Sequence, residues 1–198
     1  MKIDNLGKVT HGVTLSRVEG KPGDDKEEFQ LFTMQDLSRE SGQYNQVVEN
    51  QEVEVSKDKF DKDTLSKENL VVIGLTSYKA MVIEKNHSNK IIPSNFAIVE
   101  LNLERVDPYY FTWCFNEHPE IQKQLKVAMQ GSIIRALSIQ MLREFIMPLP
   151  SLEVQKSIGK VYELNRKRDK FLFQKNILEE KLYNHMLVKK LKEDIKCQ

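Results

Sequence analysis

The chain has 198 residues, a formal net charge of +1 and 40% hydrophobic residues, enough for one globular domain with an added segment. No apolar run reaches transmembrane length, and the N-terminal residues lack the apolar core of a signal peptide. Cys114 and Cys197 lie far apart and fit no metal-ligand spacing, so we expect a reduced, cytoplasmic protein without a membrane segment.

Charge is divided unevenly along the chain. Acidic residues outnumber basic ones in residues 1–150, whereas basic residues outnumber acidic ones in residues 151–198. Most of the negative charge lies between Glu19 and Glu68. Because affinity for nucleic acid usually depends on neutralisation of phosphates by Lys and Arg, we do not expect the first part alone to bind DNA strongly.

The first third of the chain predicts short strands joined by polar turns. Residues 3–18 alternate weakly between polar and apolar and are broken by glycines. Residues 29–33 and 51–55 are predicted strands, and residues 34–37 begin a turn or a short helix. The polar stretch over residues 56–69 is expected to be exposed.

Three apolar segments, residues 70–75, 81–83 and 96–101, predict the central strands of the domain. The two connectors between them, residues 76–79 and 84–90, are polar. The second connector is rich in amide, hydroxyl and basic groups, which suit base edges and phosphates. The same composition is equally typical of a solvated loop.

Helices are predicted after these strands. Asp107 caps a helix that has Pro108 at its first position, and its aromatic residues make it apolar on most sides, so it should be buried. Another helix starts after Pro119, and residues 138–145 form a short one. Strands and helices together predict an α+β fold, with a mixed α/β domain over residues 1–150.

Residues 151–198 predict one long helix. Pro148 and Pro150 close an extended segment, Ser151 can cap the helix, and no further proline follows. At about 1.5 Å per residue, a helix from Leu152 to Lys196 would be roughly 67 Å long. That length argues against the alternative, a C-terminal helix that folds back onto its own domain.

The apolar residues of this helix follow an imperfect seven-residue repeat with polar interruptions. Such a pattern indicates an antiparallel coiled coil with a partner helix, which the rest of the chain does not offer at matching length. We therefore predict that the helix is a spacer and dimerisation element. The residues assigned to the seam are Val154, Val161, Leu164, Phe171, Leu178, Leu182, Leu191 and Ile195.

No catalytic constellation is found in the sequence. There is no Walker loop, nucleophile elbow or dinucleotide-binding glycine motif, and the four histidines are scattered singly. The segment 107–110 partly matches the Asn/Asp-Pro-Pro-aromatic motif of amino-methyltransferases, but the second proline is missing and a helix start explains it better. We expect no catalysis, no metal and no cofactor.

Four segments, taken in order, resemble the specificity subunits of type I restriction-modification systems: residues 91–96, 107–110, 130–132 and 147–155. In that family a target recognition domain ends in a boundary like the last segment and continues into a long helix. The resemblance covers roughly residues 70–185, and little of it lies in residues 1–69. No single segment is diagnostic, whereas the order and spacing are fairly specific.

The resemblance implies a non-catalytic subunit that reads DNA. Family members have two recognition domains held apart by two antiparallel helices, which fix the spacing of a bipartite site and dock methyltransferase subunits. The implied partners are double-stranded DNA, a methyltransferase subunit and a restriction subunit. This chain carries one domain and one helix, so it is either a half-size subunit that forms a homodimer or half of a longer chain. A homodimer should read an inverted repeat.

Polar residues that flank the central strands are the candidates for DNA contact, although no family motif marks them. Tyr78 equally fits an aromatic that covers the sheet edge. Arg135 has the clearest chemical reason, because a guanidinium pairs bidentately with guanine or a phosphate. The full set is Ser77, Tyr78, Lys79, Lys85, Asn86, His87, Asn89, Lys90, Gln130, Ser132 and Arg135.

Two other functions stay open at this point. The first is a scaffold or regulatory protein that uses the helix to bind partners and no longer reads DNA, which the acidic segment between Glu19 and Glu68 favours. The second is the recognition region of a methyltransferase whose catalytic domain lies elsewhere in a larger polypeptide.

Overall fold

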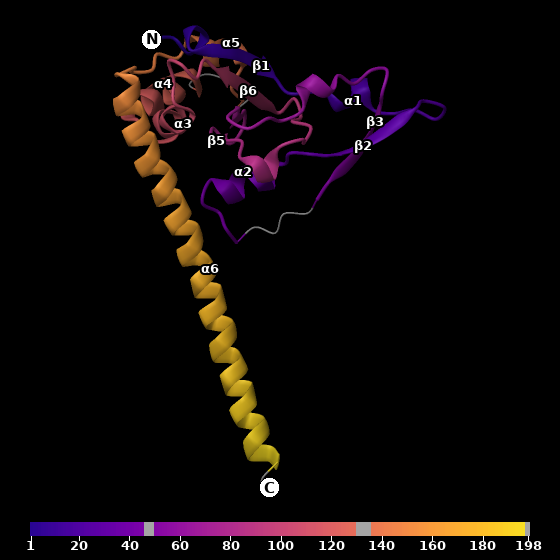
Figure 1. Cartoon of the computed structure of the whole chain (residues 1–198), viewed down its shortest axis with the longest axis vertical. Helices are drawn as coiled ribbons and strands as arrows, with labels where there is room; N and C mark the ends of the chain where they lie inside the picture. The colour runs from indigo at the N-terminus through magenta and orange to yellow at the C-terminus, as the bar shows by residue number, and fades with distance from the viewer. Residues whose placement is uncertain (46–49, 130–135, 197–198) are drawn as a thin grey trace. The chain divides into compact units, whose positions relative to one another are not determined.

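The computed structural model describes residues 1–45, 50–129 and 136–196, the side chains of residues 194–196 excepted (Figure 1). The chain divides into two units, Met1–Tyr162 and Glu163–Gln198. The first is called the compact unit below. It contains the sheets and the shorter helices, whereas the described part of the second unit is helical.

The described elements follow one another as short strands, then short helices, then one long helix. The helices are α1 (Leu15–Val18), α2 (Met34–Glu40), α3 (Pro108–Glu117), α4 (Pro119–Met129), α5 (Ile139–Glu144) and α6 (Leu152–Lys196). The strands are β1 (Gly7–His11), β2 (Lys26–Gln30), β3 (Glu52–Ser56), β4 (Val71–Gly74), β5 (Ala80–Val82) and β6 (Phe96–Leu101). Three short 3-10 turns are η1 (Ile3–Asn5), η2 (Lys62–Thr64) and η3 (Lys85–His87).

The main sheet has the strand order β1-β6-β4-β5, and every neighbouring pair is antiparallel. All four residues of β4 are buried, as expected for a continuous β-branched strand at the centre of a sheet. Val71 lies opposite Val99 of β6, which in turn lies opposite Val9 of β1, so these three valines share one face.

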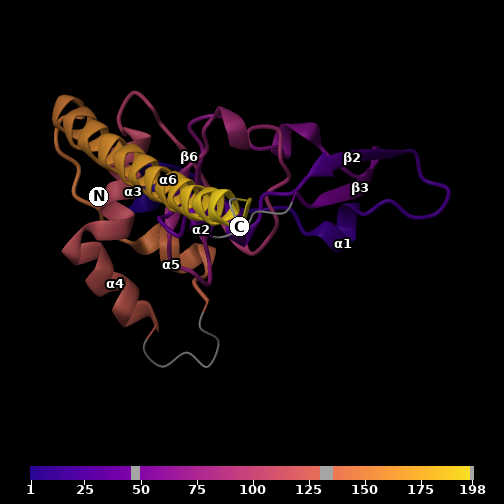
Figure 2. The same ribbon diagram turned by 90° about the horizontal axis from the view of Figure 1, so that it is seen from below.

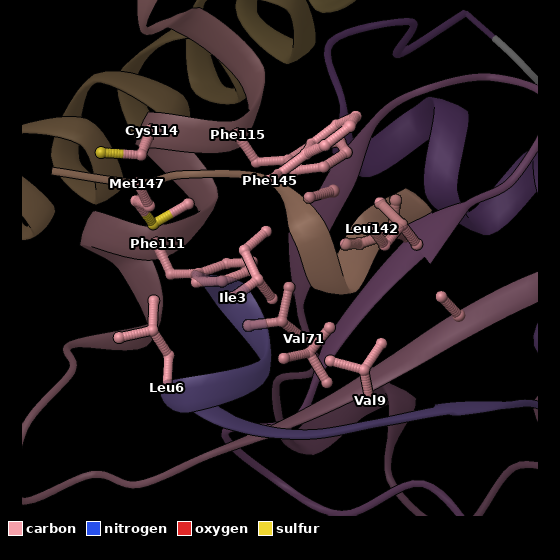
Figure 3. Packing of buried hydrophobic residues seen from close by; sticks show 14 of the residues in the cluster. Ile3, Leu6, Val9, Val71, Phe111, Cys114, Phe115, Leu142, Phe145 and Met147 are labelled. Atoms are coloured by element: carbon pink, nitrogen blue, oxygen red, sulfur yellow. The ribbon is translucent and has the colours of Figure 1, made fainter. Parts of the chain in front are cut away.

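That face packs on α3, α5 and the segments at the two ends of the compact unit. Phe111 and Phe115 project from α3 into this core, which Leu142 of α5 and Cys114 of α3 also join (Figure 3). Burial raises the pKa of the Cys114 thiol to about 11, so it stays protonated at neutral pH and serves packing. The rest of this core includes Ile3, Leu6, Val106, Phe145 and Met147.

The opposite face of the sheet packs on α2 and the residues before it. Val72 and Met81, which lie opposite each other in β4 and β5, contact a cluster that includes Phe32, Leu37 and Phe96. The sheet is thus covered on both sides. All three predicted segments form strands, but only β4 and β6 are central, whereas β5 lies at the edge of the sheet.

The strands β2 and β3 form a separate antiparallel ribbon. Its apolar face contributes Phe29 and Val55 to a third cluster with Phe60 and Ile91. Both views place the ribbon at the far end of the compact unit from α3 and α4 (Figures 1 and 2). The ribbon carries four acidic residues, Glu27, Glu28, Glu52 and Glu54, against one lysine, Lys26.

Three local predictions differ from the structure. Residues 56–69 were expected to be exposed, but Ser56 and Ser66 are buried, and the Ser66 hydroxyl bonds the backbone of His87 and Lys90. The strand expected over residues 29–33 is displaced to Lys26–Gln30, because Phe32 is fully buried in the cluster under α2. Residues Leu15–Val18 form one helical turn instead of a strand, closed by the Glu19 N–H on the carbonyl of Leu15. The α+β class and the long terminal helix are confirmed.

Candidate functional site

The root of α6 is fixed to the start of α3 by one glutamine. Gln155 is 1% exposed although it is polar. Its Oε1 accepts a hydrogen bond from the N–H of Asp107 at 3.2 Å, and its Nε2 donates to the carbonyls of Arg105 and Pro150 at 3.0 and 2.9 Å. A buried amide with its partners in place is stable, whereas its loss would leave buried backbone groups unpaired.

Gly159 brings α6 into close contact with the same helix start. A Cβ atom at this position would lie 2.3 Å from Oδ1 of Asp107 and 2.9 Å from the backbone nitrogen of Tyr110. One turn later, Asn116 of α3 donates to the hydroxyl of Tyr162 at 3.0 Å. The first eleven residues of α6 therefore belong to the compact unit, although the sequence assigned no role to Gln155 or Gly159.

The predicted seam residues form an exposed apolar set along α6. In the compact unit Val154 and Val161 are 45% and 61% exposed, and in the second unit Phe171 and Leu178 are 68% and 65% exposed. Phe171, Leu178 and Leu182 also line a shallow groove of about 380 Å³. Leu164 and Leu191 are exposed as well, whereas the side chain of Ile195 lies outside the described residues.

The charged residues of the second unit stabilise α6 locally. Lys175 faces Glu179 at 3.5 Å and Lys189 faces Glu193 at 4.0 Å, both four residues apart along the helix. Such exposed pairs contribute only a few tenths of a kcal/mol each. They do not explain why so many large apolar side chains stay in water on this helix.

The predicted DNA contacts fall at two ends of β5. Lys79 lies in the connection between β4 and β5 and is exposed. Lys85, Asn86 and Asn89 lie after β5, where all three are exposed. The candidates therefore lie in the two connections that flank the three-residue strand β5, and more of them lie in the second connection.

Ser77 and Tyr78 lie in the connection before β5. Tyr78 adopts a left-handed backbone conformation with φ of 56° and packs against the main core cluster. The Ser77 hydroxyl is buried and has no hydrogen-bond partner among the described atoms. Tyr78 thus has the packing expected of an aromatic that covers a sheet edge.

His87 and Lys90 differ from their neighbours because they are 7% and 8% exposed. Both side chains point toward Asp36 of α2, at 3.6 Å from His87 Nδ1 and 3.4 Å from Lys90 Nζ. Both side chains therefore lie inside the compact unit, where Lys90 bonds Asp36 and neither ring nitrogen of His87 has a hydrogen-bond partner among the described atoms. The other candidates, Gln130, Ser132 and Arg135, lie outside the described residues.

The outer face of the β2–β3 ribbon is acidic. Glu28 lies directly opposite Glu54, with Glu52 on the same face. Repulsion from Glu52, a hydrogen bond between the two carboxyls and the charge of Glu54 raise the pKa of Glu28 above its usual value. Lys26 contacts Glu54 at 2.7 Å on the same ribbon.

We expect Glu28→Gln to stabilise the fold at neutral pH. A carboxyl whose pKa is raised on folding favours the folded state at low pH, and this contribution is lost as pH rises through the raised value. The substitution should raise Tm at about pH 7, where Glu is ionised, and less at about pH 4. Thermal unfolding followed by circular dichroism measures both values. Glu68→Gln is the control, because Glu68 is also exposed. A lower Tm for Glu28→Gln at neutral pH would contradict the repulsion between Glu28 and the other glutamates of the ribbon.

A groove of about 680 Å³ lies between α4 and α5 and was not predicted from the sequence. Val127 and Met141 line it and are 67% and 38% exposed. Its rim carries Glu120, Lys123 and Glu144, and its floor includes Phe145. Nothing in the structure identifies an occupant for it.

Within the described ranges, no group of three or more His, Cys, Asp or Glu side chains is arranged to hold a metal ion. The same residues include no helix with the length and hydropathy needed to cross a bilayer.

No protein-family model matches the chain, and no curated protein sequence matches it either. Solved structures do match. The HsdS subunit from Thermoanaerobacter tengcongensis aligns with a TM-score of 0.60 and 16% identity, over 87% of this chain and 43% of its own.

Two further structures agree with this match. One, described as the structural basis of complex assembly and conformational transition of the type I R-M system, has a TM-score of 0.60 and 16% identity, over 91% of this chain and 45% of its own. The type I restriction-modification system S subunit from M. genitalium has a TM-score of 0.50 and 15% identity, over 85% and 38%. This chain spans less than half the length of each neighbour. Its fold, a mixed α+β unit continued by a long helix, is that of the specificity subunits of type I restriction-modification systems.

Proposed function

We propose that the chain is a non-catalytic DNA-sequence-recognition subunit of a type I restriction-modification complex and that its compact unit reads one half-site. The observation that carries this proposal is the match to HsdS over 87% of the chain, which includes both the α+β unit and the helix. A fold can serve several functions, so the DNA-reading role needs a test of DNA binding.

We further propose that the chain acts as a homodimer through α6. It covers 43% of the HsdS chain, so two copies would supply a comparable length with two recognition units and two helices. Exposed apolar side chains such as Phe171 and Leu178 would be covered in an antiparallel pair of α6 helices. A two-fold axis between the copies would present two equal units to the duplex.

The proposed DNA contacts are the polar side chains beside β5. Lys79 and Lys85 are exposed and can neutralise phosphates or donate to guanine. Asn86 and Asn89 are exposed amides, the group that pairs bidentately with adenine in the major groove. Ser77 and Tyr78 lie beside Lys79 on the same connection, but the Ser77 hydroxyl is buried and Tyr78 packs against the core, so Lys79 is the leading contact there.

A methyltransferase subunit and a restriction subunit are the proposed protein partners, and the cytoplasm is the proposed location. Because acidic residues outnumber basic ones in residues 1–150, most of the affinity for DNA should come from the assembled complex rather than from this chain alone. The specificity subunit would then choose the site, and its partners would supply the catalysis.

Selection from random duplexes tests the proposal directly. We expect the chain, purified together with its methyltransferase subunit, to enrich an inverted repeat with a fixed spacer. Binding should weaken steeply as salt rises, because phosphate contacts release counterions. Two unrelated half-sites would contradict the homodimer, and enrichment of no motif would contradict the reading of DNA.

A scaffold or regulatory role is the second candidate. The acidic outer face of the β2–β3 ribbon, with Glu28, Glu52 and Glu54 together, favours it because that face would repel phosphates. The salt-dependent binding of duplex DNA by the complex separates this candidate from the first.

A further inference from the structure

Residues 84–90, called the 84–90 loop, lie in the connection between β5 and β6. The loop has an inner side, which carries His87 and Lys90, and these two residues are 7% and 8% exposed. Its outer side carries the exposed residues Lys85, Asn86 and Asn89, together with Glu84, whose carboxylate accepts a hydrogen bond from the hydroxyl of Tyr109 at 3.0 Å. The loop therefore buries polar groups to hold itself in place while it presents others to solvent.

Ser66 holds the backbone of the loop from one side. Its hydroxyl is fully buried, donates to the carbonyl of His87 at 2.6 Å and accepts the N–H of Lys90 at 2.8 Å. Its backbone N–H donates to the carbonyl of Lys90 at 2.9 Å, and its carbonyl accepts the N–H of Asn89 at 2.8 Å. Four hydrogen bonds to a single serine fix the last residues of the loop.

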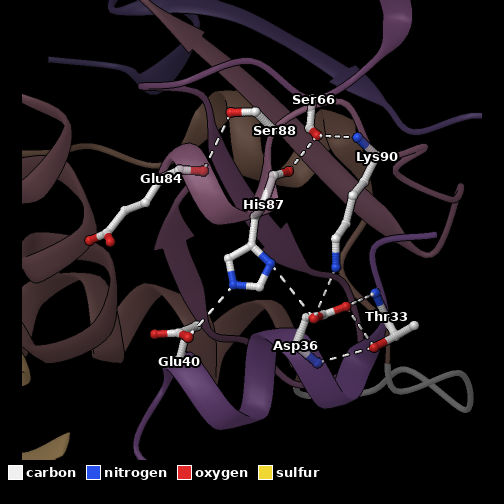
Figure 4. Close-up of polar contacts among 8 residues, drawn as sticks. All are labelled: Thr33, Asp36, Glu40, Ser66, Glu84, His87, Ser88 and Lys90. Carbon is white, nitrogen blue, oxygen red and sulfur yellow. Dashed lines mark hydrogen bonds and ion pairs between the residues drawn. The ribbon is translucent and has the colours of Figure 1, made fainter. Parts of the chain in front are cut away.

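The helix α2 holds the side chains of the loop (Figure 4). Oδ1 of Asp36 faces Nζ of Lys90 at 3.4 Å and Nδ1 of His87 at 3.6 Å. Oε1 of Glu40, one turn further along α2, faces Nε2 of His87 at 3.6 Å. The imidazole thus lies between two carboxylates of the same helix, and its ring packs edge-on against Phe32 with centroids 5.7 Å apart.

Asp36 is itself held in place. Its Oδ2 accepts hydrogen bonds from the N–H and the hydroxyl of Thr33 at 2.8 and 2.9 Å, in a capping box at the start of α2. Charged groups as buried as Asp36 and Lys90 gain little net stability, since desolvation offsets their attraction, but a buried pair does define one geometry. Such a cluster is suited to fixing where the loop lies.

We propose that the 84–90 loop is the base-reading element of the compact unit and that His87 and Lys90 are positioning residues. Lys90 holds the loop on α2 through its bond to Asp36, and His87 does so by packing its ring against Phe32 beside Asp36 and Glu40. The outer side chains Lys85, Asn86 and Asn89 contact DNA. The inference rests on the proposed function, and it replaces the sequence prediction that His87 and Lys90 touch DNA themselves.

Two lysines of the same loop supply a matched pair of variants. Lys90→Met removes the buried charge and keeps a flexible side chain of similar length, whereas Lys85→Met makes the same change on the exposed side. His87→Phe keeps a ring against Phe32 and removes both nitrogens. Hydrogen exchange of the loop amides is measured in the full chain without DNA, and circular dichroism confirms that each variant is folded.

The DNA arm uses the complex with the methyltransferase subunit. It compares binding to the selected duplex and to a shuffled duplex of equal length. We expect Lys90→Met and His87→Phe to speed exchange of the loop amides about tenfold and to reduce discrimination between the duplexes about tenfold, the cost of one misread base pair. Lys85→Met should leave exchange unchanged, weaken binding to both duplexes and lower the salt dependence.

The arms fail in different ways. Unchanged loop exchange in both buried variants would overturn the positioning role of His87 and Lys90. Faster exchange with full discrimination between the duplexes would overturn the reading role of the loop. If the wild-type complex does not discriminate between the duplexes, the proposed function and the reading role of the loop both fail. The exchange data still show whether His87 and Lys90 position the loop.

Discussion

Replacing Phe171 and Leu178 together by Glu should convert the protein from a dimer to a monomer. Both side chains are about two-thirds exposed on α6 and lie one heptad apart on the predicted seam. In an antiparallel helix pair they would be buried, and the four carboxylates of the double variant would have to leave water. Light scattering should give twice the 23.1 kDa chain mass for the wild type and 23.1 kDa for the double variant.

Asn176→Glu is the matched control for this prediction. It adds one carboxylate per chain, against two in the double variant, to the same exposed stretch of α6, but on a different face from Phe171 and Leu178. It should leave the dimer intact. The proposed homodimer would be contradicted if the wild-type chain kept its helix content and stayed at the monomer mass across a range of concentrations.

Gly159→Ala should destabilise the compact unit, although alanine is the better helix former. At an ordinary helix position this change stabilises by about 0.5–1 kcal/mol. Here the new Cβ would meet Oδ1 of Asp107 at 2.3 Å and the backbone nitrogen of Tyr110 at 2.9 Å. Overpacking of this kind costs about 1–3 kcal/mol, so we expect a net loss that shows in chemical denaturation.

Whether Gly159→Ala lowers or raises stability tests the packing of α6, because alanine is unfavourable at this position only if α6 lies close to α3. Ser157→Ala, two residues earlier and exposed, should change stability little. In an Asp107→Ala background the cost of Gly159→Ala should shrink, since one of the two clashing atoms is gone. A stabilising Gly159→Ala would show that the root of α6 is not packed on the start of α3.

The sequence predicted the elements whose signals are local. The bounds of α6 follow from Ser151, the prolines before it and the absence of any proline after it. The cap of α3 is likewise local, and Asp107 accepts the N–H of Tyr110 at 2.8 Å as predicted. The central strands followed from their runs of β-branched residues.

The parts that sequence reasoning missed depend on distant partners. Composition alone could not show that Lys90 is buried, because the carboxylate that pairs with it, Asp36, lies 54 residues earlier. Gln155 was noted only as the last residue of the 147–155 segment, and its bond to Asp107 spans 48 residues. The strand around Phe29 was misplaced for the same reason, since Phe32 is withdrawn into a cluster that forms only in three dimensions.

The pairing of the chain's first residues with the segment before α6 has a topological consequence. The N–H of Ile3 donates to the carbonyl of Phe145 at 2.9 Å, and Met1 exchanges backbone hydrogen bonds with Met147 in both directions. The first residues of the compact unit and the segment that leads into α6 are thus neighbours. A short linker could join them while the chain is cut at a surface turn elsewhere, and every strand pairing would survive such a circular rearrangement.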